Sequence, residues 1–293
     1  MAGGGRGLER AKAFLRLIRP VNCLMTGAAV LIGALIALSC QGGRGDIAHR
    51  LLLGFSTGFL LTGASMAVND YCDRHIDAIN EPGRPIPSGL VRPGEALALA
   101  AALAALGLAA ALATGPECLA IALASLAISL LYSTAGKRTG LPGNLLVSAC
   151  VAIPFIYGGF AAGRGLGPSL GVFASMAFLS NAGREVTKGI ADIEGDGARG
   201  VRTVAVARGG RAAAALALAF FALAVALSAI PPLLGLVSAW YLPPVIAADL
   251  GFLRSSLRVL RNPTRPEALG AKRSALAWMA LGMIAFLAGS CLR

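Results

Sequence analysis

The sequence contains little charge, few aromatic residues and almost no histidine. Only 14% of its 293 residues are charged, 6% are aromatic and two are histidine. Hydrophobic residues instead make up 56% of the chain, and its mean hydropathy is +0.73. A chain so poor in charge cannot cover the surface of a soluble globular protein, which is normally rich in charged side chains. The composition therefore indicates a polytopic helical membrane protein and excludes an ordinary soluble enzyme.

The cysteines and the net charge exclude two further classes. The six cysteines contain no CxxC spacing, so we interpret them as small apolar packing residues rather than as disulfide or zinc ligands. The net charge of +12 raises the question of nucleic acid. However, the basic residues lie in loops that flank apolar segments, and no nucleic-acid-binding module interrupts those segments. We expect no nucleic-acid partner.

Long apolar runs predict a bundle of about nine transmembrane helices. A helical span needs about 20 mainly apolar residues. The 38 glycines and the abundant alanines suit close helix packing. We predict an all-α fold with a central cavity, formed by a single domain over residues 1–293, and hypothesise an internal repeat of two four-helix halves. The predicted spans lie near 21–40, 51–70, 96–114, 117–133, 142–162, 168–185, 211–230, 233–253 and 274–291.

The distribution of basic residues predicts the orientation of these spans. If the N-terminus is cytoplasmic, 22 of the 26 lysines and arginines fall on the cytoplasmic side, as the positive-inside rule requires. An odd number of spans then places the C-terminus outside. We therefore expect a multi-pass protein of the cell membrane, with the functional residues of the long loops facing the cytoplasm.

Two short acidic stretches stand out in this apolar chain. They are Asn69–Asp77 (NDYCDRHID) and Asp192–Asp196 (DIEGD), and with Glu81 and Glu185 they hold eight of the 14 carboxylates. Carboxylates at the ends of membrane helices are costly unless they are paired, metal-bound or hydrated, so they indicate a functional site. We predict one cation site shared by both stretches. Solvated loop charges, or partners for nearby arginines and lysines, are the alternative.

The spacing of the acidic residues favours a hard divalent cation. In a helix, Asn69, Asp73 and Asp77 would follow each other at i, i+4 and i+8, and Asp70 would point elsewhere. Lys188, Asp192 and Asp196 have the same spacing. Oxygen ligands without histidine or cysteine suit Mg²⁺, which binds one or two carboxylates together with substrate phosphate oxygens. The predicted metal ligands are Asn69, Asp73, Asp192 and Asp196, and the predicted catalytic residues are Asp73, Asp77, Asp192 and Asp196.

Basic and polar residues near these stretches are candidates for binding a diphosphate or phosphate. Lys188, Lys137, Arg74 and Arg84 have the charge to neutralise it, although each also fits a purely topological role. Asn22 and Tyr132 complete the predicted substrate-binding set. Their alternative roles are a helix-packing hydrogen bond for Asn22 and interfacial anchoring for Tyr132, whose ring could instead stabilise a carbocation.

At the level of whole motifs, the chain resembles the UbiA superfamily of intramembrane prenyltransferases. The resemblance rests on NDYCDRHID with INEPGRPIPSG, and on REVTKGIADIEGD at the end of another span. It implies Mg²⁺-dependent transfer of an isoprenyl group from a prenyl diphosphate to an acceptor, with the acidic residues above as metal-binding positions. Many members carry a tyrosine three residues before the lysine of the second motif, whereas this chain has Glu185.

Within the superfamily, these motifs are most similar to those of the archaeal branch that makes ether lipids. That similarity implies geranylgeranyl diphosphate as donor and geranylgeranylglyceryl phosphate as acceptor. No residue of the motifs stands out as a catalytic base, so the proton acceptor is left between the diphosphate itself and Asp77. An aromatic acceptor of the quinone-precursor type, such as 4-hydroxybenzoate, is the alternative within the family. An ion-coupled transporter is the alternative outside it, although transporter sites usually lie near the middle of the bilayer.

Overall fold

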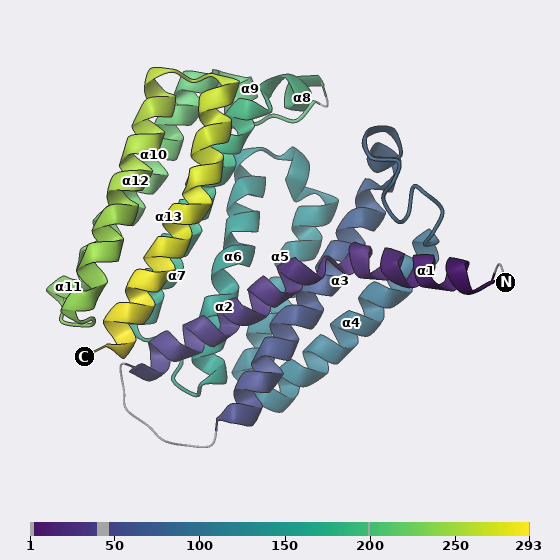
Figure 1. Cartoon of the computed structure of the whole chain (residues 1–293), viewed down its shortest axis with the longest axis horizontal. Coiled ribbons are helices and arrows are strands. Elements are labelled where there is room, and N and C mark those ends of the chain that lie inside the picture. The colour runs from purple at the N-terminus through teal and green to yellow at the C-terminus, as the bar shows by residue number, and fades with distance from the viewer. Residues whose placement is uncertain (1–2, 40–46, 199, 293) are drawn as a thin grey trace. The chain divides into compact units, whose positions relative to one another are not determined.

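The described part of the chain is entirely helical. The computed structural model describes residues 3–39, 47–198 and 200–292, and no strand occurs among them (Figure 1). The all-α prediction is therefore confirmed. The helices are α1 Gly3–Ile18, α2 Pro20–Ser39, α3 Ala48–Asn80, α4 Pro93–Thr114, α5 Pro116–Thr134, η1 Gly136–Arg138, α6 Leu141–Ala161, α7 Pro168–Ala191, α8 Ile193–Ala198, α9 Val204–Arg208, α10 Gly210–Ser228, α11 Ile230–Leu233, η2 Ala239–Tyr241, α12 Leu242–Arg261 and α13 Arg265–Cys291.

Seven of the described helices are long and apolar enough to cross a membrane, namely α2, α3, α4, α5, α6, α10 and α13. This finding agrees with a membrane-embedded protein. The helices α7 and α12 are also long, but they carry several charged residues and are not among the seven. The count of nine spans and the cytoplasmic N-terminus therefore stay predictions. Residue 40, at the end of the first predicted span, lies outside the described residues.

Prolines lie at the start of several helices, and one of these helices starts later in the chain than predicted. A proline occupies the first turn of α4, α6, α7, α12 and α13, where it suits the helix because its missing N–H has no partner to lose. The span predicted at 233–253 was placed too early. The chain forms the short α11 and η2 before Tyr241, and α12 begins at Leu242, followed by Pro243 and Pro244.

The chain forms two compact units, which we describe separately. Unit 1 comprises Met1–Leu31 and Asp46–Thr134, and unit 2 comprises Ile32–Gly45 and Ala135–Arg293. In unit 1, α3 and α4 run side by side (Figure 1). A small core joins α1, α3, the 81–92 loop and the start of α4, and it contains Ala13, Leu17, Ala67, Ile86, Val91, Ala96 and Ala100. This core anchors the loop that follows the first acidic stretch.

Unit 2 is a bundle in which α7 packs on α6, α10 and α13. Its core combines alanines with larger side chains such as Val186, Ile190, Phe221 and Phe252. Small residues allow close helix approach: a Cβ atom on Gly251 of α12 would lie 2.4 Å from the Trp278 ring of α13. The helices α8 and α9 lie at the same end of the bundle as the start of α13 (Figure 1).

The packing role predicted for the cysteines fits Cys23 and Cys118, which are buried. Cys72 and Cys150 are half-buried and Cys291 is exposed, and none of these five described cysteines forms a disulfide. Cys40 lies outside the described residues.

Candidate active site

The first acidic stretch lies on the last turns of α3. This helix has 33 residues, which is well beyond the roughly 20 that a span needs. Its excess length carries the acidic stretch past the apolar part of the helix. The prediction that Asn69–Asp77 is helical is therefore confirmed, and the helix ends at Asn80 because Pro82 cannot continue it.

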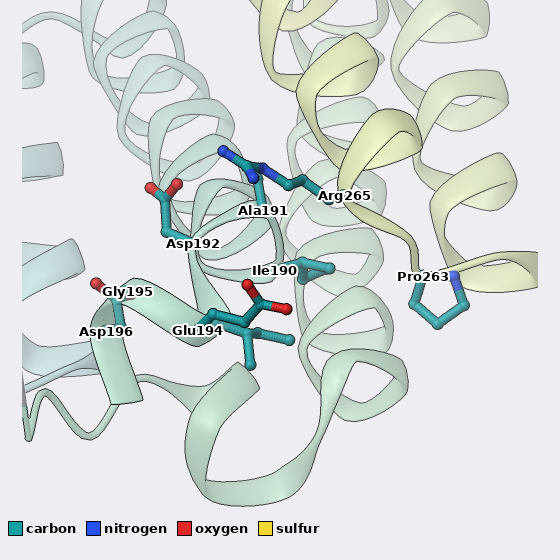
Figure 2. Close-up of a pocket in the computed structure, with 9 residues that line it drawn as sticks. Ile190, Ala191, Asp192, Glu194, Gly195, Asp196, Pro263 and Arg265 are labelled. Carbon is teal, nitrogen blue, oxygen red and sulfur yellow. The ribbon is translucent and has the colours of Figure 1, made fainter. Parts of the chain in front are cut away.

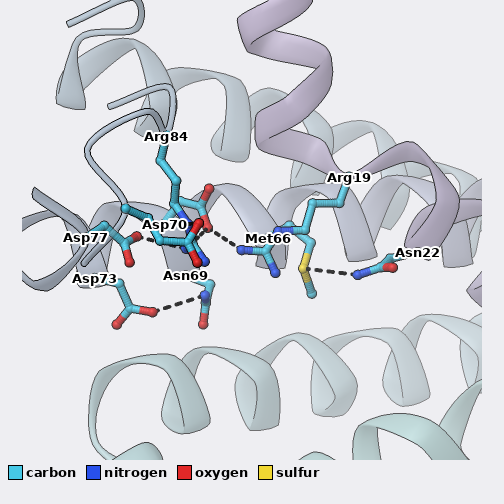
Figure 3. A network of polar contacts seen from close by, with 9 residues as sticks. Arg19, Asn22, Met66, Asn69, Asp70, Asp73, Asp77 and Arg84 are labelled. Carbon is cyan, nitrogen blue, oxygen red and sulfur yellow. Dashed lines mark hydrogen bonds and ion pairs between the residues drawn. The ribbon is translucent and has the colours of Figure 1, made fainter. Parts of the chain in front are cut away.

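Asn69 and Asp73 form a pair on one face of α3. The Asn69 side-chain amide donates a hydrogen bond to the Asp73 carboxylate at 3.2 Å (Figure 3). Both residues are half-buried. Because the amide nitrogen donates to Asp73, the Asn69 carbonyl oxygen is directed away from that carboxylate. The pair thus offers oxygen ligands from two neighbouring turns, as the i, i+4 spacing predicts.

Asp77 does not extend this pair; it shares Arg84 with Asp70. Arg84 lies 2.8 Å from a carboxylate oxygen of Asp77 and 3.5 Å from one of Asp70. The three-residue stripe of the sequence prediction was wrong in this respect. A helix turns by about 100° per residue, so eight residues drift by roughly 80°, whereas Asp70 and Asp77, seven apart, differ by only about 20°. Figure 3 shows these two acids on the Arg84 side of α3 and Asp73 on the other.

Arg19 is a member of this network that the sequence interpretation missed. Its guanidinium lies 2.6 Å from the buried Asp70 carboxylate, and its backbone has φ of 50°, the one positive φ of a non-glycine residue in the described chain. This residue separates α1 from α2. With Arg16, Arg84, Asp70 and Glu81 it lines a cavity of about 310 Å³ in unit 1.

The pKa of Arg84 follows from this network. Burial alone lowers the pKa of its guanidinium, but the carboxylates of Asp77, Asp70 and Glu81 outweigh burial and raise the pKa above its ordinary value. Arg84 is therefore charged at every physiological pH. Its three ion pairs fix the loop after α3 to the last turns of that helix.

The remaining predicted residues of unit 1 occupy separate places. Arg74 stacks on the Tyr71 ring, 4.3 Å from its centroid, and donates to the Tyr71 backbone carbonyl. The Asn22 amide lies 3.9 Å from the Met66 sulfur (Figure 3). Tyr132 is half-buried near the end of α5. In unit 2, the predicted Lys137 lies on η1 and is also half-buried.

The second acidic stretch begins where α7 ends. Lys188 lies in the last turn of α7, Asp192 follows the final helical residue, and Asp196 lies on α8. Asp192 departs from helical geometry, with φ of −108° and ψ of 13°. The continuous Lys188–Asp192–Asp196 stripe was therefore wrong, because the helix is interrupted at Asp192 and the chain continues as the short helices α8 and α9.

This interruption opens a cavity of about 490 Å³ in unit 2. Asp192, Glu194 and Asp196 line it, together with Pro263 from the turn before α13 and Arg265, the first residue of that helix (Figure 2). No described residue forms an ion pair or side-chain hydrogen bond with Asp192, Glu194 or Arg265. Arg265 is a second residue that the sequence interpretation missed, because it lies between two predicted spans and outside both acidic stretches. Its position beside Pro266, at a helix start, was the available signal.

Glu185 is engaged by neighbours on its own helix. Its carboxylate lies 2.7 Å from Arg184 and 3.5 Å from Lys188. Lys188 is half-buried in the last turn of α7, and Asp192, directly after that helix, is half-buried as well. The charged end of α7 therefore presents a lysine, paired with Glu185, close in sequence to Asp192.

The donor set fits Mg²⁺ better than it fits a softer metal. Among the described residues, no three His, Cys, Asp or Glu side chains gather closely enough to hold a metal ion. What each unit offers is a small set of carboxylate and amide oxygens. Mg²⁺ commonly binds to one or two carboxylates and completes its shell with water and substrate phosphate oxygens, so this set suits an ion that arrives with a diphosphate.

Apolar helices of membrane-spanning length with charged residues at their ends define a membrane-embedded helical protein. The sequence profile of the UbiA prenyltransferase family matches residues 29–282. The chain belongs to this family and is a prenyltransferase, which confirms the resemblance and the enzyme class inferred from the motifs.

Proteins with established names support this assignment over almost the whole chain. The digeranylgeranylglyceryl phosphate synthase of Methanoregula boonei is 38% identical over 276 residues, which cover 94% of this chain and 95% of that protein. The enzyme of the same name from Methanopyrus kandleri is 36% identical, with 94% and 98% covered.

Solved structures agree on the fold. The structure of a digeranylgeranylglyceryl phosphate synthase superposes with a TM-score of 0.86 at 30% identity and covers 96% of this chain and 99% of that one. A UbiA homologue from Archaeoglobus fulgidus, bound to DMAPP and Mg²⁺, superposes with a TM-score of 0.63 at 18% identity, with 93% and 98% covered.

Proposed function

We propose that this chain transfers the geranylgeranyl group of geranylgeranyl diphosphate to geranylgeranylglyceryl phosphate, with Mg²⁺, at the cytoplasmic face of the cell membrane. The observation that carries the proposal is the charged end of α7, where Lys188, Asp192, Glu194 and Arg265 adjoin an apolar helix. A prenyl diphosphate has the matching form, because it is anionic at one end and a hydrocarbon at the other. The names of the relatives supply the donor length and the acceptor.

In the proposed reaction, the bond between C1 of the prenyl chain and the diphosphate oxygen breaks, and its electrons leave with the diphosphate. The acceptor hydroxyl oxygen forms the new bond to C1. The hydroxyl proton passes to an oxygen of the departing diphosphate or to Asp77. Lys188, Lys137 and Arg265 would stabilise the diphosphate charge, since fixed cations act most strongly where charge develops. Bound Mg²⁺ would supply further positive charge at the same oxygens.

The proposed Mg²⁺ ligands are Asn69 and Asp73 in unit 1, and Asp192 and Asp196 in unit 2. Arg84 and Arg74 are proposed to favour the diphosphate through their charge, Arg84 while holding Asp70 and Asp77 in place. Asn22 and Tyr132 are proposed to bind the substrate near the interface. Exclusion of water is essential, because an allylic cation exposed to water is hydrolysed.

The proposal is tested with the full chain in liposomes. Geranylgeranyl diphosphate and geranylgeranylglyceryl phosphate are supplied together, and diphosphate release and product mass are measured. We expect a digeranylgeranylglyceryl phosphate product, loss of turnover with EDTA, and recovery with Mg²⁺. With 4-hydroxybenzoate as competing acceptor, a prenylated aromatic product in place of the lipid phosphate would overturn the proposed acceptor while leaving the family assignment intact.

A further inference from the structure

The outer face of α12 combines leucines with arginines. The buried residues of this helix repeat at intervals of three and four and pack into unit 2. A second set lies on the opposite side, and its members at positions 250, 254, 257 and 261 fall within about 60° of one another around the helix axis. We call this set the arginine–leucine face. It lines a hollow of about 500 Å³ and comprises Leu250, Leu253, Arg254, Leu257, Arg258 and Arg261.

The polarity of the arginine–leucine face changes along the helix. Its first member, Leu250, lies near the middle of α12, and its last member, Arg261, ends the helix. The three arginines lie between positions 254 and 261, over a rise of about 10 Å. They approach the end of α12 that joins α13 (Figure 1). The face is therefore charged at the helix end and apolar towards the middle of the helix.

The charge of this face is not balanced by the described part of the chain. Arg254 and Arg261 are exposed and form no ion pair or side-chain hydrogen bond with a described residue. Arg258 lies 3.9 Å from Glu267, in a pair whose members are both partly exposed. Positions 249–273 hold six basic and two acidic residues, and the second acid, Asp249, accepts a hydrogen bond from Ser228. The face therefore attracts an anion from its surroundings.

A purely topological role does not account for this arrangement. Orientation in the membrane depends on how many basic residues lie near the end of a span, and not on which side of the helix they occupy. Here the arginines share one side with exposed leucines, Leu250 and Leu257. A small soluble anion would neutralise the arginines but leave the leucines uncovered. A phospholipid satisfies both, because its phosphate lies at the membrane surface and its hydrocarbon chains extend inward.

We propose that the arginine–leucine face of α12 binds an anionic membrane phospholipid. Arg254 and Arg261 bind the headgroup phosphate, since a guanidinium matches phosphate oxygens in charge and in geometry. Their long apolar stems allow the guanidinium groups to reach the headgroup level. Leu250 and Leu257 contact the hydrocarbon chain of the same lipid. The inference goes beyond the proposed reaction and does not depend on it, because no residue of this face belongs to the candidate active site.

The test measures lipid binding to the full chain in detergent by native mass spectrometry. Phosphatidylglycerol, which is anionic, is compared with phosphatidylcholine of identical acyl chains, which carries no net charge. We expect the wild type to prefer phosphatidylglycerol. The double variant Arg254→Gln, Arg261→Gln should lower the affinity for phosphatidylglycerol about thirtyfold, since each arginine near the headgroups contributes roughly fivefold. The double variant Arg254→Lys, Arg261→Lys keeps the charge and should retain most of the affinity.

The matched control is the double variant Arg208→Gln, Arg273→Gln. It removes the same charge from exposed positions of α9 and α13 that do not line the hollow, and it should keep wild-type affinity for phosphatidylglycerol. A Tm equal to that of the wild type without added lipid shows that the variants are folded. Equal losses of affinity in the glutamine variant and in the control, or no loss in either, would overturn the site.

Inorganic phosphate separates a lipid site from a simple anion site. At the same concentration as the lipid, it should leave bound phosphatidylglycerol in place, because it makes no contact with the leucines. Complete displacement by inorganic phosphate would show that the hydrocarbon chain contributes nothing, and this result would also overturn the proposal.

Discussion

The two acidic stretches differ in what holds their carboxylates. On α3, Asp70 and Asp77 are buried and bound by Arg19 and Arg84. At the end of α7, Asp192 and Glu194 line an open cavity and have no side-chain partner among the described residues. Two motifs that look alike in the sequence thus combine two uses of acidic residues. Unit 1 commits part of its charge to buried ion pairs, whereas Asp192 and Glu194 of unit 2 face a cavity.

This difference shows how a membrane enzyme can contain an acidic region and remain stable. Breaking a buried ion pair is strongly destabilising, because the remaining charge is left uncompensated. A carboxylate beside water has no such role and can be removed at little cost. The comparison therefore separates residues by their effects on activity and on stability, and the following predictions test it in order of expected size.

The largest effect is expected for the proposed metal ligands. Asp192→Asn and Asp73→Asn should each lower prenyl transfer about a hundredfold or more, because both remove charge where the diphosphate is stabilised. Initial rates of diphosphate release measure the loss. Glu267→Gln, which alters an exposed pair with Arg258, is the matched control and should keep wild-type rates. Full activity in both aspartate variants would refute the metal-binding roles.

The next effect concerns stability and should divide the two stretches. Asp70→Asn leaves Arg19 without its carboxylate and weakens the hold on Arg84, so we expect a loss of about 3 kcal/mol, or a Tm lower by roughly 5–10 °C. Asp192→Asn should leave the Tm within about 2 °C of the wild type. Thermal unfolding in detergent measures both. Equal shifts in Tm would remove the distinction between the stretches.

Arg265 is expected to have an intermediate effect that is confined to substrate binding. Arg265→Gln should raise KM for the phosphate-bearing substrate about tenfold, which corresponds to one charge-assisted hydrogen bond near the surface. Arg265→Lys should recover part of this loss, since it restores charge without the planar fork. Arg261→Gln, an exposed change outside the cavity of Figure 2, is the control. A KM that stays at the wild-type value in Arg265→Gln would exclude Arg265 from the site.

The smallest effect is expected for an exposed ion pair within unit 1. Arg10 lies 2.7 Å from Glu95 and joins α1 to α4. Exposed pairs contribute little, because solvent and salt screen them. Arg10→Gln should shift the Tm by about 1 °C, and 1 M salt should produce a similar small shift in the wild type. A shift as large as that of Asp70→Asn would show that exposure does not distinguish these pairs.

The sequence predicted the elements better than it predicted their junctions. The apolar runs and the helical character of Asn69–Asp77 follow from local composition and spacing, and both were confirmed. The break at Asp192 and the late start of α12 were not foreseen, because they depend on how short helices and prolines close the bundle. Arg19 and Arg265 were missed for a related reason. Arg19 pairs with an acidic residue 51 positions away, and Arg265 lines a cavity together with acidic residues about 70 positions away, separations at which spacing carries no information.

Arg19 has a consequence for how this chain tolerates change. A residue with φ near 50° is usually glycine, since other side chains are strained there. At this corner the backbone favours glycine, whereas the ion pair with Asp70 needs the guanidinium of an arginine. Arg19→Gly would remove the backbone strain but leave Asp70 without this ion pair. Arg19→Lys would keep the positive charge but also the backbone strain. Neither replacement satisfies both demands, so few substitutions at this corner are neutral.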